Sequence, residues 1–181
     1  MMSQTELFSY ENQRVLVVGG ATGMGEAAAR LAANAGARVV VMDRVNVSQP
    51  SVQFISIDLG ERESIDTALE LLNGPVDAVL SCAGVADGVP GIERINFIGH
   101  RYMIDRLLDR GWLPAGSAIG MISSAAGLGW QAELSEITEF LAIKNWDDAV
   151  KWVIDHNKAN YLFVKRAMCA YVASESVALL R

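Results

Sequence analysis

The chain has 181 residues, of which 51% are hydrophobic and 20% charged, and its formal net charge is −6. This composition is typical of one globular domain with a sizeable core and excludes a disordered chain. The acidic balance, without a Lys/Arg cluster, argues against a nucleic-acid-binding surface. No apolar run approaches the roughly 18 residues of a membrane span, and the start "MMSQTELFSYENQR" lacks signal-peptide features. We therefore expect a cytoplasmic protein without a membrane partner.

Short apolar runs rich in β-branched residues alternate with longer helical patterns along the chain. Strands are predicted at "RVLVVGG" (14–20), "ARVVVMD" (37–43), "VQFISIDL" (52–59), "VDAVLSCAG" (76–84) and "GSAIGMISS" (116–124). Helices are predicted at "GEAAARLAANAG" (25–36), "ERESIDTALELLN" (61–73) and about 92–110. This alternation predicts an α/β fold, a doubly wound parallel sheet with helices on both faces.

The first predicted strand runs directly into "GGATGMG", where a helix begins. Glycine permits a tight turn and close approach of the backbone to a ligand, and a helix N-terminus attracts a pyrophosphate. A tight strand-to-helix connection without a ligand would explain the same glycines. The candidate cofactor-binding residues in this loop are Gly19, Ala21, Thr22, Gly23 and Met24, with Gly25 completing the motif.

Asp43 ends the second predicted strand, at the position where an acidic residue binds the adenosine ribose of a dinucleotide. Its carboxylate would accept hydrogen bonds from the ribose hydroxyls and repel a 2′-phosphate. The sequence therefore favours NAD over NADP. Arg44 follows directly and is suited to bind a 2′-phosphate, so NADP remains an alternative. Asp43 could also be a solvated acid at a strand end that binds no ligand.

Tyr161 and Lys165 lie four residues apart in a predicted helix, so they share one face. A nearby ammonium favours the phenolate form of tyrosine, which makes the pair a candidate for proton transfer. Tyrosine and lysine also share helix faces without any function. Ser123 and Ser124 follow the fifth predicted strand, at the sheet edge where open α/β sheets bind ligands.

Taken together, these motifs resemble the classical short-chain dehydrogenase/reductase family. The matching residues are "GGATGMG", Asp43, Asp58-Leu59, "SCAG" (81–84), "NFIG" (96–99), "ISS" (122–124), Tyr161 and Lys165. The resemblance implies a Rossmann-type fold and catalytic residues Asn96, Ser124, Tyr161 and Lys165. Tyr161 would be the acid/base, Ser124 would position the substrate oxygen, Lys165 would bind the nicotinamide ribose, and Asn96 would hold a relay water. It also implies cofactor contacts from Asp58, Leu59, Ala83 and Gly84.

The sequence departs from the family pattern at several positions. Cys82 stands in "SCAG" where asparagine is common, and Val164 precedes the lysine where serine is usual. The stretch between Ser124 and Tyr161 is longer than is typical. We expect it to form two short amphipathic helices, a helical insertion at about 128–158 within a single domain over 1–181. This insertion resembles the branch containing bacterial 3α-hydroxysteroid dehydrogenase/carbonyl reductase.

Tryptophans 130, 146 and 152 in the insertion are candidates for an apolar substrate pocket, although core packing is the commoner role. His156 has no second ligand nearby, and Cys82 and Cys169 fit no metal motif, so we expect no metal. Family members continue with further strands and a substrate lid, so we expect that these C-terminal elements are missing and that the fifth strand is an edge. The resemblance further implies a homodimer or homotetramer, and the last helix has more than one apolar face.

Two functions follow as expectations. The first is an NAD(H)-dependent oxidoreductase (EC 1.1.1.-) that interconverts a secondary alcohol and a ketone, with a hydroxysteroid or another bulky apolar molecule as substrate. The second is a dinucleotide-binding sensor or scaffold without catalysis, which Val164 and the missing lid keep open.

Overall fold

The computed structural model describes residues 8–47 and 52–179, and these residues form two compact units. Unit 1 comprises the described residues of 1–58, 63–83 and 105–122. Unit 2 comprises those of 59–62, 84–104 and 123–181. The single domain with an insertion stays a prediction.

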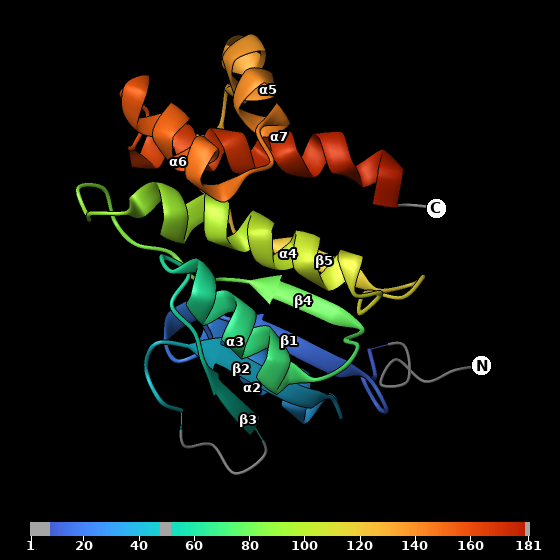
Figure 1. Ribbon diagram of the computed structural model, residues 1–181. Coiled ribbons are helices and arrows are strands. Elements are labelled where there is room, and N and C mark those ends of the chain that lie inside the picture. The colour runs from blue at the N-terminus through green and yellow to red at the C-terminus, as the bar shows by residue number, and fades with distance from the viewer. Residues whose placement is uncertain (1–7, 48–51, 180–181) are drawn as a thin grey trace. The chain divides into compact units, whose positions relative to one another are not determined.

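Unit 1 is built on a parallel sheet of five strands in the order β3-β2-β1-β4-β5 (Figure 1). The strands are β1 (Arg14–Val18), β2 (Arg38–Asp43), β3 (Val52–Ser56), β4 (Ala78–Ser81) and β5 (Ala118–Met121). The prediction of an α/β fold with a parallel sheet is confirmed. Each strand is shorter than its predicted run, by residues at its start, its end or both. As predicted, β5 lies at an edge of the described sheet.

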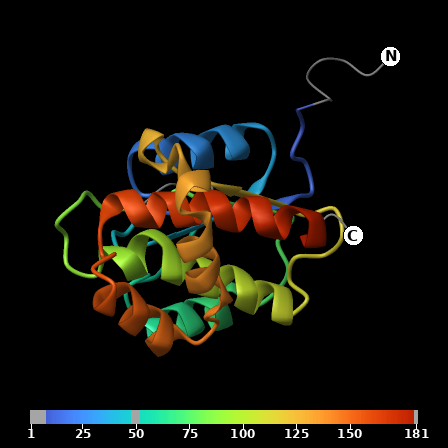
Figure 2. The ribbon, with the colours of Figure 1, turned by 90° about the horizontal axis from the view of Figure 1, so that it is seen from above.

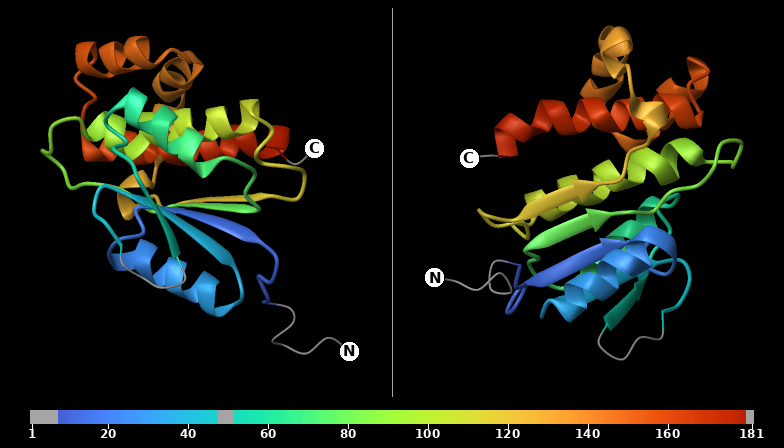
Figure 3. Two further views of the ribbon diagram at one scale, coloured as in Figure 1. Left: turned by 60° about the horizontal axis from the view of Figure 1, so that its bottom comes forward. Right: turned by 180° about the vertical axis from the view of Figure 1, so that it is seen from behind.

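Helices cover both faces of this sheet, with α2 (Gly23–Asn34) on one side and α3 (Arg62–Leu72) on the other (Figure 3). Valines of β1 and β2 point towards α2 and pack on its buried alanines, Ala29 and Ala32. Alanine is a strong helix former and small enough to let the helix lie close to the strands. On the other side, α3 buries Ile65, Leu69 and Leu72. Helix α2 is followed by Gly36 with φ +98°, a left-handed conformation that glycine commonly adopts after the end of a helix.

Unit 2 is helical. Its elements are the π-helical turn η1 (Arg94–Ile98), the start of α4 (Gly99–Asp109), the short 3₁₀ turns η2 (Ala125–Gly127) and η3 (Trp130–Glu133), and the helices α5 (Leu134–Ala142), α6 (Trp146–Asp155) and α7 (Tyr161–Leu179). Helices thus form in the segment where the sequence predicted two amphipathic helices. Helix α5 packs across α7, the longest helix (Figure 2).

Phe140 is the centre of the aromatic core of unit 2. Its ring centroid lies 5.6 Å from Phe97, 5.3 Å from Trp152 and 5.5 Å from Phe163. Trp146 and Trp152 are only 8% and 9% exposed. These two tryptophans therefore pack in the core, which was the alternative to a role in a substrate pocket.

The helix predicted over 92–110 does begin there, but residues 94–98 form a π-helical turn before α4. The sequence pattern did not reveal this turn, because a π-turn inserts one residue without changing the apolar composition. Single π-turns of this kind are found at functional sites. Among the described residues, no helix has the length and apolarity to cross a bilayer.

Candidate active site

The glycine loop of unit 1 connects β1 to α2, and two of its glycines are required by close backbone contacts. Gly19 has φ +83°, and a Cβ at this position would lie 2.4 Å from the backbone of Ala83. A Cβ at Gly25 would lie 2.0 Å from the carbonyl oxygen of Gly19. These two glycines therefore fold the loop tightly, whether or not it binds a ligand.

Gly23 and its neighbours leave the N-terminus of α2 accessible to a ligand. Gly23 has φ +59°, and no heavy atom would lie within 4 Å of a Cβ there. Thr22 occupies the N-cap position, but its side chain makes no capping hydrogen bond, and Met24 is 66% exposed. The first-turn N–H groups at the positive end of the helix thus have no side-chain acceptor from Thr22. A pyrophosphate group fits this donor set.

The carboxylate of Asp43 holds the glycine loop in place. One oxygen accepts a hydrogen bond from the Ala21 N–H at 2.9 Å, and the other accepts one from the Val45 N–H at 3.0 Å. Arg44 places its Nε 3.5 Å from a carboxylate oxygen of Asp58. Asp43 therefore has a structural role that the sequence did not predict, and ribose binding by Asp43 stays a prediction.

The remaining predicted cofactor contacts fall in both units. Ala83 belongs to unit 1, where its N–H donates to the carbonyl oxygen of Val18 at 2.9 Å. Leu59 and Gly84 belong to unit 2. Leu59 is buried, and its carbonyl oxygen would lie 2.3 Å from a Cβ at Gly99, so "NFIG" must end in glycine for α4 to start there.

Helix α7 of unit 2 carries Tyr161 and Lys165 on one face and aromatic residues on other sides. Phe163 contacts Phe140, while Tyr171 lies 5.8 Å from Phe97, edge to face. At about 100° per residue, Phe163 lies opposite the face of Tyr161 and Lys165, and Tyr171 lies about 100° away from that face. The aromatic core thus fixes the rotation of α7 and with it the direction of the candidate catalytic pair.

Three of the four predicted catalytic residues are close together in unit 2. The Nζ of Lys165, a residue only 4% exposed, lies 5.6 Å from the centre of the Tyr161 ring. A Cβ at Gly84 would lie 3.3 Å from Oδ1 of Asn96 and 3.8 Å from Nζ of Lys165. Glycine at position 84 therefore leaves room beside the amide of Asn96 and the ammonium of Lys165.

Asn96 is fully buried in the π-turn and clamps the backbone of Val85. Its Oδ1 accepts from the Val85 N–H at 2.7 Å, and its Nδ2 donates to the Val85 carbonyl at 2.9 Å. The side-chain amide therefore fixes the loop after β4 beside Lys165. Its predicted role in holding a relay water stays a prediction.

Ser123 and Ser124 make different hydrogen bonds. The hydroxyl of Ser123 donates to the carbonyl oxygen of Lys165 at 3.0 Å and lies 3.2 Å from the Cys169 sulfur. The hydroxyl of Ser124 accepts from the Ala126 N–H at 3.2 Å at the start of η2. Gly127 in η2 permits this packing, because its Cβ would lie 2.7 Å from both Ser123 Oγ and Cys169 Sγ. Ser123 thus ties the segment that carries Ser124 to the backbone of α7.

Asp87 is a residue of this site that sequence reasoning missed. Its carboxylate accepts from the Tyr161 N–H at 2.9 Å, and Asn160 Oδ1 accepts from the Phe163 N–H at 2.9 Å. Together they cap the first turn of α7, where a negative charge also favours the helix dipole. Asn160 was recognisable as an N-cap from its position, whereas no spacing in the sequence connects Asp87 to Tyr161.

Burial lowers the pKa of Lys165, and the neighbouring thiol of Cys169 opposes this shift when it is ionised. The unfolded chain, with a lysine pKa of about 10.4, binds more protons than the folded chain between the two pKa values. The free energy of unfolding therefore rises with pH across that interval. The buried ammonium destabilises the protein at neutral pH and ceases to do so when it loses its proton.

We expect Lys165→Met to be more stable than the unaltered protein at neutral pH, and we expect this difference to shrink as the pH rises toward about 10. Urea unfolding at a series of pH values measures it. Lys151→Met is the matched control, because Lys151 is 72% exposed and pairs with Asp155 at the surface. A stability difference that grows with pH, or an equal trend in the control, would contradict the prediction.

No group of three or more potential metal ligands gathers in the described part of the chain. His156 is exposed and stacks on Trp152, with ring centroids 4.1 Å apart. Both cysteines are free thiols, and burial raises the pKa of Cys82.

Comparison with known proteins identifies the family. The family model described as short chain dehydrogenase matches residues 13–135, and the chain belongs to this family of oxidoreductases, which use NAD(P). A coniferyl-alcohol dehydrogenase from Pseudomonas sp. (strain HR199 / DSM 7063) is 27% identical over 169 residues, which cover 88% of this chain and 64% of that protein.

Solved structures share the fold. A 3-alpha-hydroxysteroid dehydrogenase from Pseudomonas sp. B-0831, complexed with NADH, has a TM-score of 0.72 and 23% identity, covering 92% of this chain and 66% of that one. A short chain dehydrogenase family protein from Francisella tularensis subsp. tularensis SCHU S4 has a TM-score of 0.68 and 21% identity, covering 92% and 64%. The chain spans less than two thirds of the length of the curated relatives it matches.

Proposed function

We propose that the protein is an NAD(H)-dependent oxidoreductase that interconverts an alcohol and a carbonyl compound, with Tyr161 as the acid/base. The observation that carries this proposal is the arrangement in unit 2, where the Lys165 ammonium lies beside the Tyr161 ring, Asn96 and the open position at Gly84. A buried cation next to a phenol is suited to stabilise the phenolate that forms when Tyr161 gives up its proton.

Each unit carries residues that we propose as contacts of the cofactor. The N–H groups at the start of α2, from Thr22 to Met24, would bind the pyrophosphate, and Asp43 would accept hydrogen bonds from the adenosine ribose. Asp58 and Leu59 would contact the adenine, while Ala83 and Gly84 would line the path of the cofactor. Lys165 would bind the nicotinamide ribose. When bound, the nicotinamide dinucleotide supplies or takes up the hydride.

In the direction of reduction, the carbonyl carbon of the substrate gains a hydride and its oxygen gains the proton of the Tyr161 hydroxyl. Ser124 would donate a hydrogen bond to the same oxygen and orient it. The Tyr161 phenolate then recovers a proton from solvent, through a water held at Asn96. Oxidation of the alcohol runs through the same atoms in reverse, with Tyr161 accepting the proton.

Bulky apolar alcohols are the substrate class that the relatives suggest. One relative is named for coniferyl alcohol, and a structural neighbour is named for a hydroxysteroid. We propose a substrate of this chemical type, without choosing between an aromatic alcohol and a steroid, and a homodimeric or homotetrameric assembly.

We expect Asp43→Ser to lower the ratio of NAD affinity to NADP affinity by at least about tenfold, because the change removes a carboxylate that would bind the ribose hydroxyls and repel a 2′-phosphate. The ion pair of Arg44 with Asp58 supports NAD, since it directs this guanidinium to an acid already present. Fluorescence titration with NADH and NADPH measures both affinities. Asp66→Ser is the control: Asp66 is an aspartate of the same unit that pairs with Arg106 and is not among the proposed cofactor contacts. This variant should keep the affinity ratio of the unaltered protein. Tighter binding of NADPH by the unaltered protein would contradict the assignment.

A second candidate function is dinucleotide binding without turnover, as in a sensor or scaffold. The observation that favours it is Val164, which is fully buried directly before Lys165 where the family usually has a serine. NADH titration alongside turnover on a panel of aldehydes and ketones separates the two functions. Saturable NADH binding with no turnover on any member would support the second.

A further inference from the structure

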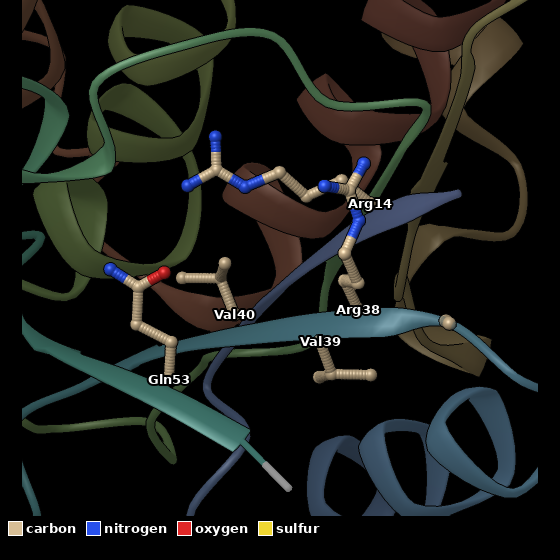
Figure 4. Close-up of a pocket in the computed structure, with 6 residues that line it drawn as sticks. Arg14, Arg38, Val39, Val40 and Gln53 are labelled. Atoms are coloured by element: carbon tan, nitrogen blue, oxygen red, sulfur yellow. The ribbon is translucent and has the colours of Figure 1, made fainter. Parts of the chain in front are cut away.

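A pocket of about 470 Å³ lies in unit 1 at the end of the sheet where the strands begin. We call it the amino-edge pocket; it is lined by Arg14, Ala37, Arg38, Val39, Val40 and Gln53. In Figure 4 the side chains of Arg14, Arg38, Val40 and Gln53 rise from one face of the strands, while Val39 points to the other face. The glycine loop follows the opposite, carboxyl end of β1, so this pocket is separate from the candidate dinucleotide site.

Two arginines stand side by side in this pocket. Arg14 opens β1 and Arg38 opens β2, and the two residues are register partners on adjacent parallel strands. Side chains in this relation share a face and lie close together, and like charges so placed repel each other. Burial lowers the pKa of Arg14, and the charge of Arg38 lowers it further.

The described part of the chain offers no carboxylate within ion-pair distance of either guanidinium. Arg14 donates instead to two backbone carbonyls, those of Leu72 at 2.6 Å and Pro75 at 3.4 Å. Arg38 has one long hydrogen bond, to the carbonyl oxygen of Asn12 at 3.4 Å. Asp77 accepts from the backbone N–H of Arg14, not from its guanidinium.

Of the other arginines of the same unit, two have acidic partners, whereas Arg30 and Arg110 have no ion pair in the described part of the chain. Arg44 pairs with Asp58 and Arg106 pairs with Asp66. Arg14 and Arg38 differ in that they are register neighbours of like charge, and no carboxylate of the described residues lies within ion-pair distance of either guanidinium. A bound anion would neutralise the repulsion between Arg14 and Arg38 and would give Arg38 a charged acceptor, which the described residues do not provide.

The pocket also has the form of a binding site for a small molecule. Arg14 is held by its hydrogen bond to the carbonyl oxygen of Leu72 at the end of α3, while Arg38 and Gln53 are exposed and accessible to a ligand. Val40, which is 2% exposed and lies on the same face as the arginines, forms the base of the pocket. The volume exceeds that of an inorganic anion and leaves room for a small organic group.

We propose that the amino-edge pocket binds a small oxyanion, the phosphate or carboxylate group of a metabolite, between Arg38 and Arg14 with Gln53 as a further hydrogen-bonding group. This site goes beyond the proposed oxidoreductase function and does not depend on it.

Isothermal titration with inorganic phosphate, and separately with acetate, tests the proposal. We expect Arg38→Ala to weaken binding of the preferred probe by at least about tenfold. Arg38→Gln serves as a second variant in case the first folds poorly. Arg30→Ala is the matched control, since Arg30 is an exposed arginine on α2 of the same unit, and it should bind as the unaltered protein does. Preference for phosphate or acetate identifies the class of anion. Equal affinity in Arg38→Ala and the unaltered protein, or an equal loss in Arg30→Ala, would overturn the proposal.

Repeating the titration with NADH present separates this pocket from the glycine loop, which is also suited to bind phosphate. Binding in the amino-edge pocket should survive saturation with NADH and be lost in Arg38→Ala. Binding in the glycine loop should be lost on saturation and survive in Arg38→Ala, a result that overturns the proposal. If NADH does not bind, the oxidoreductase function fails, and the arginine variants still decide on the pocket.

Discussion

Replacing Tyr161 with phenylalanine is expected to reduce kcat by at least about a hundredfold and to leave the affinity for NADH nearly unchanged. The change removes only the hydroxyl that gives or takes the proton, and the ring can keep its place beside Lys165. The Tyr161 backbone N–H donates to Asp87, and Phe163 packs on Phe140; neither contact involves the hydroxyl, so we expect α7 to keep its position.

The measurement compares steady-state turnover and NADH titration for the variant and the unaltered protein on the best carbonyl compound of a panel. Tyr102→Phe is the matched control, because Tyr102 also lies on a helix, four residues before the basic residue Arg106, and we assign it no catalytic role. The Tyr102 ring packs edge-on against Trp146 at 5.6 Å. Turnover by Tyr161→Phe above a few per cent of the unaltered rate would exclude Tyr161 as the acid/base.

The second large effect is expected from Gly25→Ala. The new Cβ would stand 2.0 Å from the carbonyl oxygen of Gly19, so the backbone of the glycine loop has to shift. We expect a loss of about 2–3 kcal/mol in the free energy of unfolding, as for other overpacked sites, together with loss of NADH binding.

Urea unfolding and NADH titration measure both parts of this prediction. Gly23→Asn is the control within the same loop, since its Cβ meets open space and asparagine tolerates a positive φ. The control should remain close to the unaltered protein in stability. If Gly25→Ala binds NADH as tightly as the unaltered protein, the loop is not the pyrophosphate site.

The sheet was predictable because apolar runs such as "RVLVV" and "RVVVM" are buried on both faces, a pattern typical of parallel strands. The glycine loop, Asp43 and the Tyr161–Lys165 pair were also visible, since each depends on residues near one another in the sequence or on a family motif. Burial was harder to predict. The sequence shows that Val164 lacks the hydroxyl of the usual serine, but only the structure shows that its side chain is fully buried.

The parts that could not be predicted depend on contacts between distant residues. Asp87 caps Tyr161 across 74 positions, and Asn96 clamps Val85 from a π-turn that has no signature in the sequence. Asp43 illustrates the same limit in another way. Its position at a strand end predicted a ribose contact, whereas the structure shows that its carboxylate also bonds the backbone of the glycine loop.

Transfer of deuterium from NADH labelled at nicotinamide C4 tests the central claim most directly. The unaltered protein is incubated with labelled NADH and a panel of bulky aldehydes and ketones, and the products are analysed by mass spectrometry. We predict that at least one carbonyl compound becomes an alcohol carrying one deuterium on carbon, and that Tyr161→Phe forms far less of it. Saturable binding of NADH without any labelled alcohol, or equal labelling by the variant, would contradict the account.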